Sequence, residues 1–348
     1  TVDDIKTATT QAIGIFIDSP ISLITNCKCT DISGLDQAAA YCFSNDACVA
    51  QYCNAQDVSA TTTAVGFKLE GLSANEGFQM LECNIQRCEA DNFAAGFYLK
   101  DTLLTAKNCS SSFVLAPLNA DGFLTTTRLM VLENCNANLS AAFDPTGVAR
   151  GFYFESSQVR ANNCTAWYRF GGNLAQGFCM NQAQANLTNC STGACSAGVE
   201  NNGFFIGSGS SILTDCQTEN LDAGPGVAYS FRIAQSASQP LLINCIAKNA
   251  SSPTPSRGFF IEGQQSTLKN CIATNIQDSG FEITPNANLT ILTGSTAADN
   301  GNFGIINSGI NSKICDSYAT NNGTNYSGGI PFTVLPGAAP IVCGNVDA

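Results

Sequence analysis

Histidine is absent from all 348 residues, and charged residues make up only 12% of the chain. Without an imidazole, the chain cannot use the Ser-His-Asp or Cys-His nucleophile systems or histidine acid–base catalysis. The net charge is −12 and the pI is about 4.3. This argues against a nucleic-acid partner, because nucleic-acid-binding proteins normally carry a basic patch. Apolar runs stay far below the roughly 18–20 residues of a membrane span, so we expect none.

Cysteine, by contrast, is abundant, with 18 residues. So many cysteines favour an oxidising compartment or a structural use of the thiol. The chain begins at Thr1 rather than at Met, as it would after removal of a signal peptide. These features predict a protein that is secreted or displayed on a cell or virion surface.

A Gly-Phe pair recurs along the chain, and a cysteine follows it, usually after thirteen residues. The pairs begin at Gly66, Gly96, Gly122, Gly151, Gly177, Gly203, Gly258 and Gly280, with degenerate copies at Gly14, Ser230 and Asn302. The cysteines that follow are Cys27, Cys83, Cys109, Cys135, Cys164, Cys190, Cys216, Cys245, Cys271 and Cys315. Repeats of this length are typical of solenoids, whose coils gain a core only by stacking on their neighbours.

Each repeat has the pattern of three short strands. Phe259 and Ile261 share one face of a strand, and Phe260 lies on the other. A second strand ends at a leucine, and the cysteine opens the third. The residue before the cysteine is usually asparagine, which tolerates the left-handed conformation that a tight bend requires.

This repeat resembles that of the right-handed parallel β-helix proteins, the pectin-lyase-like superfamily, from Gly14 to about Cys343. The asparagine before the third strand is similar to the asparagine ladder of that family. The resemblance implies an all-β fold, a single-stranded right-handed parallel β-helix solenoid of about 11–13 coils. We assign residues 1–13 to an N-terminal capping or assembly segment, which could form a helix, and residues 14–348 to the β-helix, with a cysteine-rich insertion at 28–65.

The periodic cysteines predict one inward column of small, buried side chains. This predicted ladder comprises Cys83, Cys109, Cys135, Cys164, Cys190, Cys216, Cys245, Cys271 and Cys315, with Cys27 before them. Vertical disulfides between coils are the alternative. A linear column of thiols offers no tetrahedral cage, so we expect no metal and no cofactor. Disulfide candidates outside the column are Cys29, Cys42, Cys48, Cys53, Cys179 and Cys195.

The resemblance also implies a carbohydrate-active enzyme. The polygalacturonase-like type carries a histidine that this chain lacks. The pectate-lyase-like type uses an arginine base beside calcium held by carboxylates, and no sequence column stacks such groups on adjacent coils. The only candidates for a catalytic role are Arg160, Arg169 and Glu155.

One outward column of the first strand is unexpectedly apolar. It contains Tyr98, Leu124, Tyr153, Cys179, Phe205 and Phe260. Exposed apolar patches usually mark contact sites, although a long loop could instead cover these residues. We therefore predict a non-enzymatic structural or adhesive β-helix that forms a homo-oligomer or filament, with glycans or a host surface as further candidate partners. The alternative is a pectin-lyase-like polysaccharide lyase or a glycan-binding module.

Overall fold

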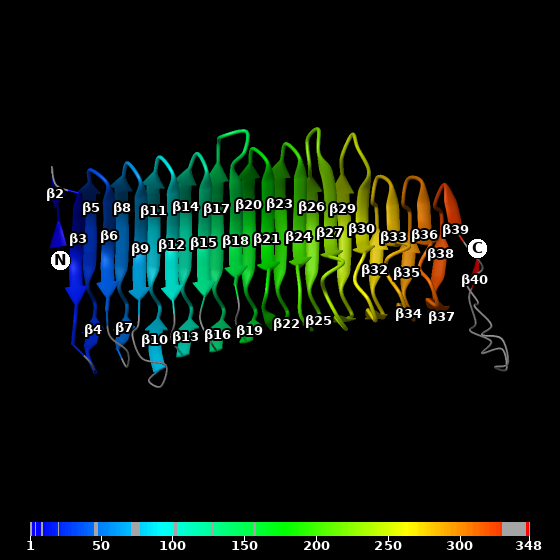
Figure 1. The fold of residues 1–348 in the computed structure, drawn as a ribbon, viewed down its shortest axis with the longest axis horizontal. Helices are drawn as coiled ribbons and strands as arrows, with labels where there is room; N and C mark the ends of the chain where they lie inside the picture. The colour runs from blue at the N-terminus through cyan, green and yellow to red at the C-terminus, as the bar shows by residue number, and fades with distance from the viewer. Residues whose placement is uncertain are drawn as a thin grey trace.

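The computed structural model describes residues 2–3, 5–7, 10–19, 21–44, 48–70, 77–100, 103–126, 129–155, 158–328 and 346–347. Within these ranges the chain is all β and forms a parallel solenoid of about 12 turns. The coils stack into a rod whose two labelled chain ends lie at opposite ends (Figure 1). The predicted all-β parallel β-helix of 11–13 coils is confirmed. No helix in the described ranges is long and apolar enough to cross a membrane.

Each coil adds one strand to each of three parallel sheets, in the order B, C, A. Sheet B contains β3 (Gln11–Ile17), β6 (Gln37–Phe43), β9 (Thr63–Glu70), β12 (Phe93–Lys100), β15 (Asn119–Thr126), β18 (Val148–Phe154), β21 (Leu174–Met180), β24 (Glu200–Ile206), β27 (Val227–Ile233), β30 (Ser256–Ile261), β33 (Ser279–Ile283), β36 (Phe303–Asn307) and β39 (Thr324–Gly328). Sheet C contains β4 (Leu23–Thr25), β7 (Val49–Gln51), β10 (Gly77–Leu81), β13 (Leu103–Lys107), β16 (Leu129–Glu133), β19 (Gln158–Asn162), β22 (Gln184–Thr188), β25 (Ile212–Thr214), β28 (Leu241–Ile243), β31 (Thr267–Lys269), β34 (Ile291–Thr293) and β37 (Lys313–Cys315).

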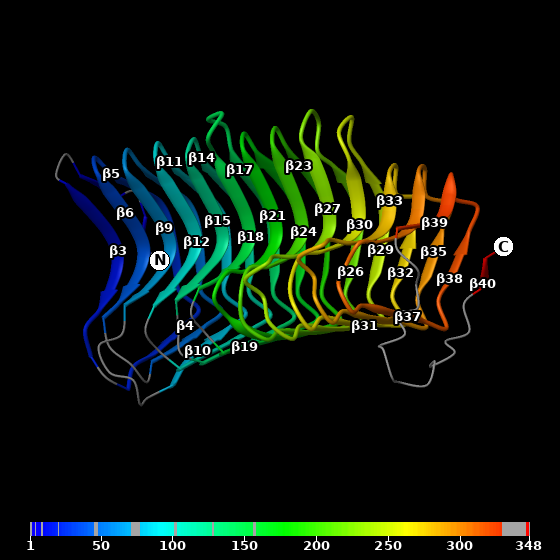
Figure 2. The same cartoon turned by 45° about the vertical axis from the view of Figure 1, so that its right-hand side comes forward.

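Sheet A contains β1 (Val2–Asp3), β2 (Lys6–Thr7), β5 (Lys28–Gly34), β8 (Asn54–Ala60), β11 (Asn84–Ala90), β14 (Ser110–Ala116), β17 (Asn136–Ala142), β20 (Thr165–Gly171), β23 (Ser191–Ala197), β26 (Gln217–Asp222), β29 (Ile246–Ser251), β32 (Ile272–Thr274), β35 (Thr296–Ala298), β38 (Tyr318–Thr320) and β40 (Val346–Asp347). Figure 2 shows sheet C, marked by β4, β10, β19 and β31, along the lower side of the rod.

The Gly-Phe pair builds the core between sheets A and B. In register, Phe97 pairs with Phe67 on one side and Phe123 on the other. The rings from Tyr41 to Phe281 form one continuous stack with centroids 4.4–5.3 Å apart. The glycine permits close approach of the sheets, since a Cβ on Gly96 would lie 2.0 Å from the Ser111 hydroxyl.

The N-terminal residues form strands rather than the short helix that the sequence suggested. β1 and β2 both pair with β5, at the edge of sheet A. Within residues 28–44 and 48–65 the chain forms β5, β6, β7, β8 and the start of β9, regular strands of sheets A, B and C, rather than a loop insertion. The reason is that Ala40 and Tyr41 take the places of glycine and phenylalanine, and the Tyr41 ring stacks 4.5 Å from Phe67.

The membership of the cysteine ladder also differs from the prediction at both of its ends. Gln51 pairs with Leu81 through sheet C, so Cys53, two residues later, precedes Cys83 in the ladder. At the other end, Cys315 pairs with Thr293 and therefore lies two residues before the ladder position, which Ser295 and Ser317 occupy. The sequence pattern placed the core aromatic residue of this coil at Phe303, whereas the core residue there is Ile305.

Each coil makes two left-handed bends, one just before its sheet A strand and one within that strand or, in the last coils, directly after it. The first is the predicted asparagine position: Asn108, Asn134 and Asn163 each have φ of 53°. The second, four residues after the ladder cysteine, was not predicted. Its residues are Asp31, Asp57, Arg87, Phe113, Leu139, Tyr168, Ala194, Asn220, Asn249, Asn275, Asp299 and Asn321, all with positive φ.

Candidate functional site

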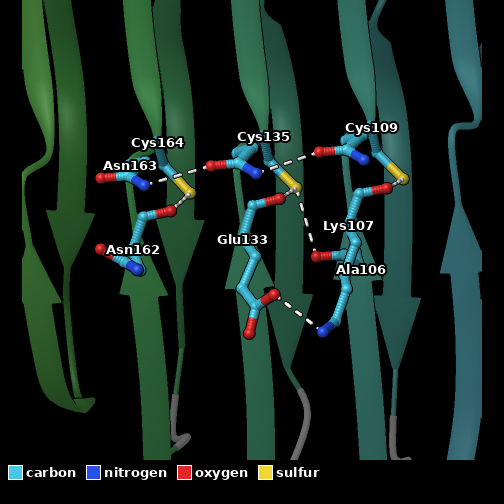
Figure 3. Close-up of polar contacts among 10 residues, drawn as sticks. Ala106, Lys107, Cys109, Glu133, Cys135, Asn162, Asn163 and Cys164 are labelled. Atoms are coloured by element: carbon cyan, nitrogen blue, oxygen red, sulfur yellow. Dashed lines mark hydrogen bonds and ion pairs between the residues drawn. The ribbon is translucent and has the colours of Figure 1, made fainter.

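The cysteine ladder is a column of hydrogen-bond donors beside the first bend. Cys135 donates to the carbonyl of Ala106 in the preceding coil (3.5 Å) and to that of Glu133 in its own (3.6 Å) (Figure 3). Beside it, the Asn134 amide donates to the Asn108 side chain, 3.1 Å away. Ser317 makes the equivalent bond to the carbonyl two residues earlier, at 2.9 Å. The thiols therefore serve the fold, and the asparagine ladder is confirmed.

The six cysteines predicted as disulfide candidates are all buried, and those other than Cys48 are free thiols. The six are Cys29, Cys42, Cys48, Cys53, Cys179 and Cys195. Cys179 and Cys195 do not pair with each other, since Cys179 lies on the outer face of sheet B and Cys195 points into the core from sheet A. Among the predicted ladder members, Cys315 alone is disulfide-bonded.

The three catalytic candidates lie on or beside three different sheets. Arg160 is exposed on β19 of sheet C, and Glu155 follows β18 of sheet B. Arg169 of β20 is fully buried in the core, where it donates to the carbonyls of Ala137, Trp167 and Tyr168. Burial lowers the pKa of this guanidinium to about 10. The structure therefore does not bring these three residues together as an active site.

The predicted apolar stripe lies on the outer face of sheet B, where arginine side chains contact two of its rings. Tyr98, Tyr153, Phe205 and Phe260 are half-buried, whereas Leu124 is only 8% exposed. The sequence suggested that a long loop could cover these residues, but the described parts of residues 28–65 form strands. Instead, ion-paired arginines pack on the rings. The Arg150 guanidinium lies 3.8 Å from the Tyr153 centroid, and that of Arg257 lies 4.8 Å from the Phe260 centroid.

Each arginine of this face has carboxylate partners on neighbouring coils. Arg150 makes two hydrogen bonds to the fully buried Asp121, at 2.6 and 2.9 Å. Burial raises the pKa of Asp121, and the guanidinium opposes that shift. Arg232 pairs with Glu200 at 2.6 Å and Glu262 at 3.2 Å, and Arg257 pairs with Glu282. The positive charges of this face are thus already neutralised within the molecule.

The outer face of sheet A carries an exposed cluster that the sequence analysis missed. We call Phe113, Leu139, Trp167, Tyr168 and Phe170 the aromatic patch. Phe113 is 48% exposed, Tyr168 50% and Phe170 44%. They lie on the adjacent strands β14, β17 and β20, which pair in register. Phe113, Leu139 and Tyr168 therefore stand at the same bend position of three successive coils.

Gly193 leaves room for the indole ring of Trp167 in the aromatic patch. Gly193 is the in-register neighbour of Trp167, and a Cβ at Gly193 would lie 2.5 Å from the indole ring. The ring therefore lies over the bare backbone of β23. On its other side, Trp167 pairs with Asn138, whose buried side-chain oxygen has no hydrogen-bond partner.

A polar hollow flanks the patch on each side along the same face. One, of about 650 Å³, is lined by residues that include Asn220, Asp222, Asn249, Ser251, Asn275, Gln277 and Asp299. The other, of about 480 Å³, is lined by residues that include Lys6, Asp31, Asp57, Ser59, Arg87 and Glu89. Both hollows follow the second bend, which indents the outer surface of sheet A.

The sequence does contain a signal for this face. In the coils toward the two ends of the rod, the fourth residue after the ladder position is usually Asp or Asn, as in Asp57 and Asn249. Phe113, Leu139 and Tyr168 break that column in the middle of the chain, so the bend was not recognised. Among the described residues, no group of three or more Cys, Asp and Glu side chains is arranged to hold a metal ion.

No protein-family model and no curated protein matches the chain. Solved structures with a similar backbone include a surface adhesin of Streptococcus pneumoniae, PfbA, at 10% identity and a TM-score of 0.46, covering 85% of this chain and 82% of that one. The A-module of the Azotobacter vinelandii mannuronan C-5 epimerase AlgE4 also has 10% identity and a TM-score of 0.46, covering 87% and 88%. The tailspike protein 3 of bacteriophage CBA120 has 9% identity and a TM-score of 0.39, covering 90% and 57%.

These values say nothing about activity, because adhesin, epimerase and tailspike share only the general backbone plan. The three parallel sheets of the chain itself carry the structural assignment. The chain is a parallel β-helix.

Proposed function

We propose that this protein is a non-enzymatic structural and adhesive rod that works outside the cell or on a cell or virion surface, through the outer face of sheet A. The aromatic patch is the observation that carries the proposal. Contiguous exposed apolar groups of this kind usually mark contact sites. Phe113 and Tyr168 leave about half of their surface in solvent although the fold has a continuous core elsewhere.

A surface-adhesion assay tests this function. The purified rod should adhere to extracellular polysaccharide matrices or to host cells, and the Phe113→Asn/Tyr168→Asn double variant should lose most of that adhesion. Phe16→Asn is the matched control, because Phe16 is also exposed (55%) but lies at the first strand of sheet B. Equal adhesion by all three proteins would contradict the proposal.

The pairing of the arginines supports a non-enzymatic role. A lyase needs a cation free to receive the substrate carboxylate and a base beside the reacting carbon. Arg150, Arg232 and Arg257 each make an ion pair with a neighbouring coil. We expect no unsaturated product when the protein is incubated with polyuronates and calcium, and formation of such a product would restore the lyase alternative.

Association into a homo-oligomer or filament is the second candidate, favoured by the N-terminal coil. Its strands β3 and β4 each pair on one side only within the described residues. Ile21 is 82% exposed and Leu23 66% exposed on this coil. Unpaired strand edges with apolar side chains recruit further strands. Sedimentation velocity and electron microscopy should show end-to-end association that Leu23→Lys abolishes; a monomer at all concentrations would exclude it.

A further inference from the structure

We propose that the outer face of sheet A binds an uncharged polysaccharide chain, which lies across β14, β17 and β20 and extends into the polar hollows on both sides. This inference rests on the adhesive function proposed above and names its partner. Three independent features of the face support it: the conformation of its aromatic residues, the chemistry of the hollows and the distribution of charge.

The backbone conformation is the first feature. Phe113 has φ of 57° and Tyr168 φ of 60°, in the left-handed region that bulky side chains disfavour. At the same bend, other coils use Asn249 and Asn275, which adopt this conformation readily. The two rings are not buried in return, since about half of each is exposed. Strain of this kind persists mainly at functional sites.

The chemistry of the rings and hollows is the second feature. The electron-rich face of an aromatic ring attracts the C–H groups on the flat face of a pyranose, which carry a partial positive charge. Side-chain amides and hydroxyls both donate and accept hydrogen bonds, as sugar hydroxyls do. Asn220, Asn249 and Gln277 supply amides to the larger hollow, and Ser251 supplies a hydroxyl. Apolar stacking in the centre and hydrogen bonding on both sides suit an extended sugar chain.

Charge is the third feature, and it selects among polysaccharides. Among the described residues, the larger hollow is lined by Asp222 and Asp299 and by no lysine or arginine. In the smaller hollow, Asp31, Asp57 and Glu89 outnumber Lys6 and Arg87. On the other side of the patch, Lys248 of β29 pairs with Glu219 of β26 at 3.6 Å. With a net charge of −12, the protein repels polyuronates and other acidic glycans. An uncharged glycan has no such penalty.

Titration of the full chain with neutral oligosaccharides tests the inference. The probes are hexasaccharides of β-glucan, mannan and xylan, with oligogalacturonate and oligoalginate as acidic comparators. We expect at least one neutral probe to bind and to change the fluorescence of Trp167, the single tryptophan. The affinity should not depend on salt, because no ion pair is formed. Phe113→Asn and Tyr168→Asn should each weaken binding about tenfold.

The same variants separate a binding defect from a folding defect. Asparagine suits the left-handed bend better than phenylalanine or tyrosine, so both variants should keep or raise the melting temperature while losing affinity. Phe16→Asn should leave the affinity unchanged. Binding of the acidic probes alone, or neutral binding that both variants retain, would overturn the inference. If the patch variants instead abolish self-association, the face is a contact between copies of the chain, which also overturns it.

Failure of this inference is distinguishable from failure of the adhesive function. Loss of cell or matrix adhesion in the double variant, without binding of any neutral probe, would retain the adhesive face but exclude its assignment to uncharged glycans. Absence of both adhesion and glycan binding would exclude the two proposals together.

Discussion

The outer faces of sheets A and B both carry aromatic residues, but their surroundings differ. On sheet B, arginines lie on the rings and are paired with carboxylates from neighbouring coils, as Arg150 is with Asp121. On sheet A, Phe113 and Tyr168 stand on left-handed bends and are about half exposed. In a parallel solenoid, then, an apolar outward residue indicates a contact surface only if the adjacent coils leave it uncovered.

Breaking the buried pair of sheet B should have the largest effect. Asp121→Ala leaves the Arg150 guanidinium without its bidentate partner, and we expect a loss of about 3–5 kcal/mol of unfolding free energy. Urea denaturation measures this. The control is Glu89→Ala on sheet A, where the partner Arg87 is also exposed and the loss should be about 0–1 kcal/mol. Equal losses would show that the two faces do not differ as described.

The next largest effect should come from Arg232 on sheet B. Arg232→Met removes two charge-assisted bonds from a side chain only 22% exposed, at an expected cost of about 1–2 kcal/mol. Lys248→Met on sheet A breaks a 3.6 Å pair whose side chains are 42% and 31% exposed, and should change stability by less than about 0.5 kcal/mol. Thermal unfolding of the two variants in parallel measures both losses. A larger loss for Lys248→Met would show that the outer face of sheet A, and not that of sheet B, is covered by its own ion pairs.

A smaller, stabilising effect is expected at the second bend of sheet A. Ala194 has φ of 50°, so Ala194→Gly relieves strain and should raise stability by about 0.5–1 kcal/mol. Ala298→Gly is the matched control on β35, a strand position where Ala298 does not have positive φ, and should lower stability by a similar amount. A decrease for both variants would contradict the strain at this bend.

The smallest effect is expected from thiol labelling of Cys179 on the outer face of sheet B. Cys179 points outward from sheet B, yet it is 3% exposed, and burial raises its pKa to about 12. It should therefore remain unlabelled by iodoacetamide in the native protein at neutral pH. Ser251→Cys introduces a comparison thiol on the exposed face of sheet A, which should react rapidly, as peptide mass spectrometry would show. Rapid labelling of Cys179 would mean that sheet B is open.

The fold was predictable because its signals repeat. Gly-Phe, the first bend and the ladder cysteine occupy the same place in most coils, and stacking converts each into a column. The errors occurred where a coil satisfied the same geometry with other residues. Tyr41 stacks like a phenylalanine, and Ser317 hydrogen-bonds like a ladder cysteine, so neither matched the pattern.

The aromatic patch was not predictable for a different reason. Its members do not repeat, and single-sequence periodicity detects only what does. The outward stripe of sheet B, in contrast, was recognised by its period, but its covering by arginines depends on contacts between coils. Arg150 and Asp121 are 29 residues apart in sequence and become neighbours only through the register of β15 and β18.

The stacking direction of the coils also has a mechanical consequence. The ladder hydrogen bonds of all three sheets run between successive coils, along the rod, while the strands run across it. A tensile load on the two ends would therefore act directly along those bonds and be shared by three ladders at every interface. Because each interface carries the full load and the interfaces are in series, the rod should yield one coil at a time at its weakest junction, which limits the force that an adhesive contact on its surface can transmit.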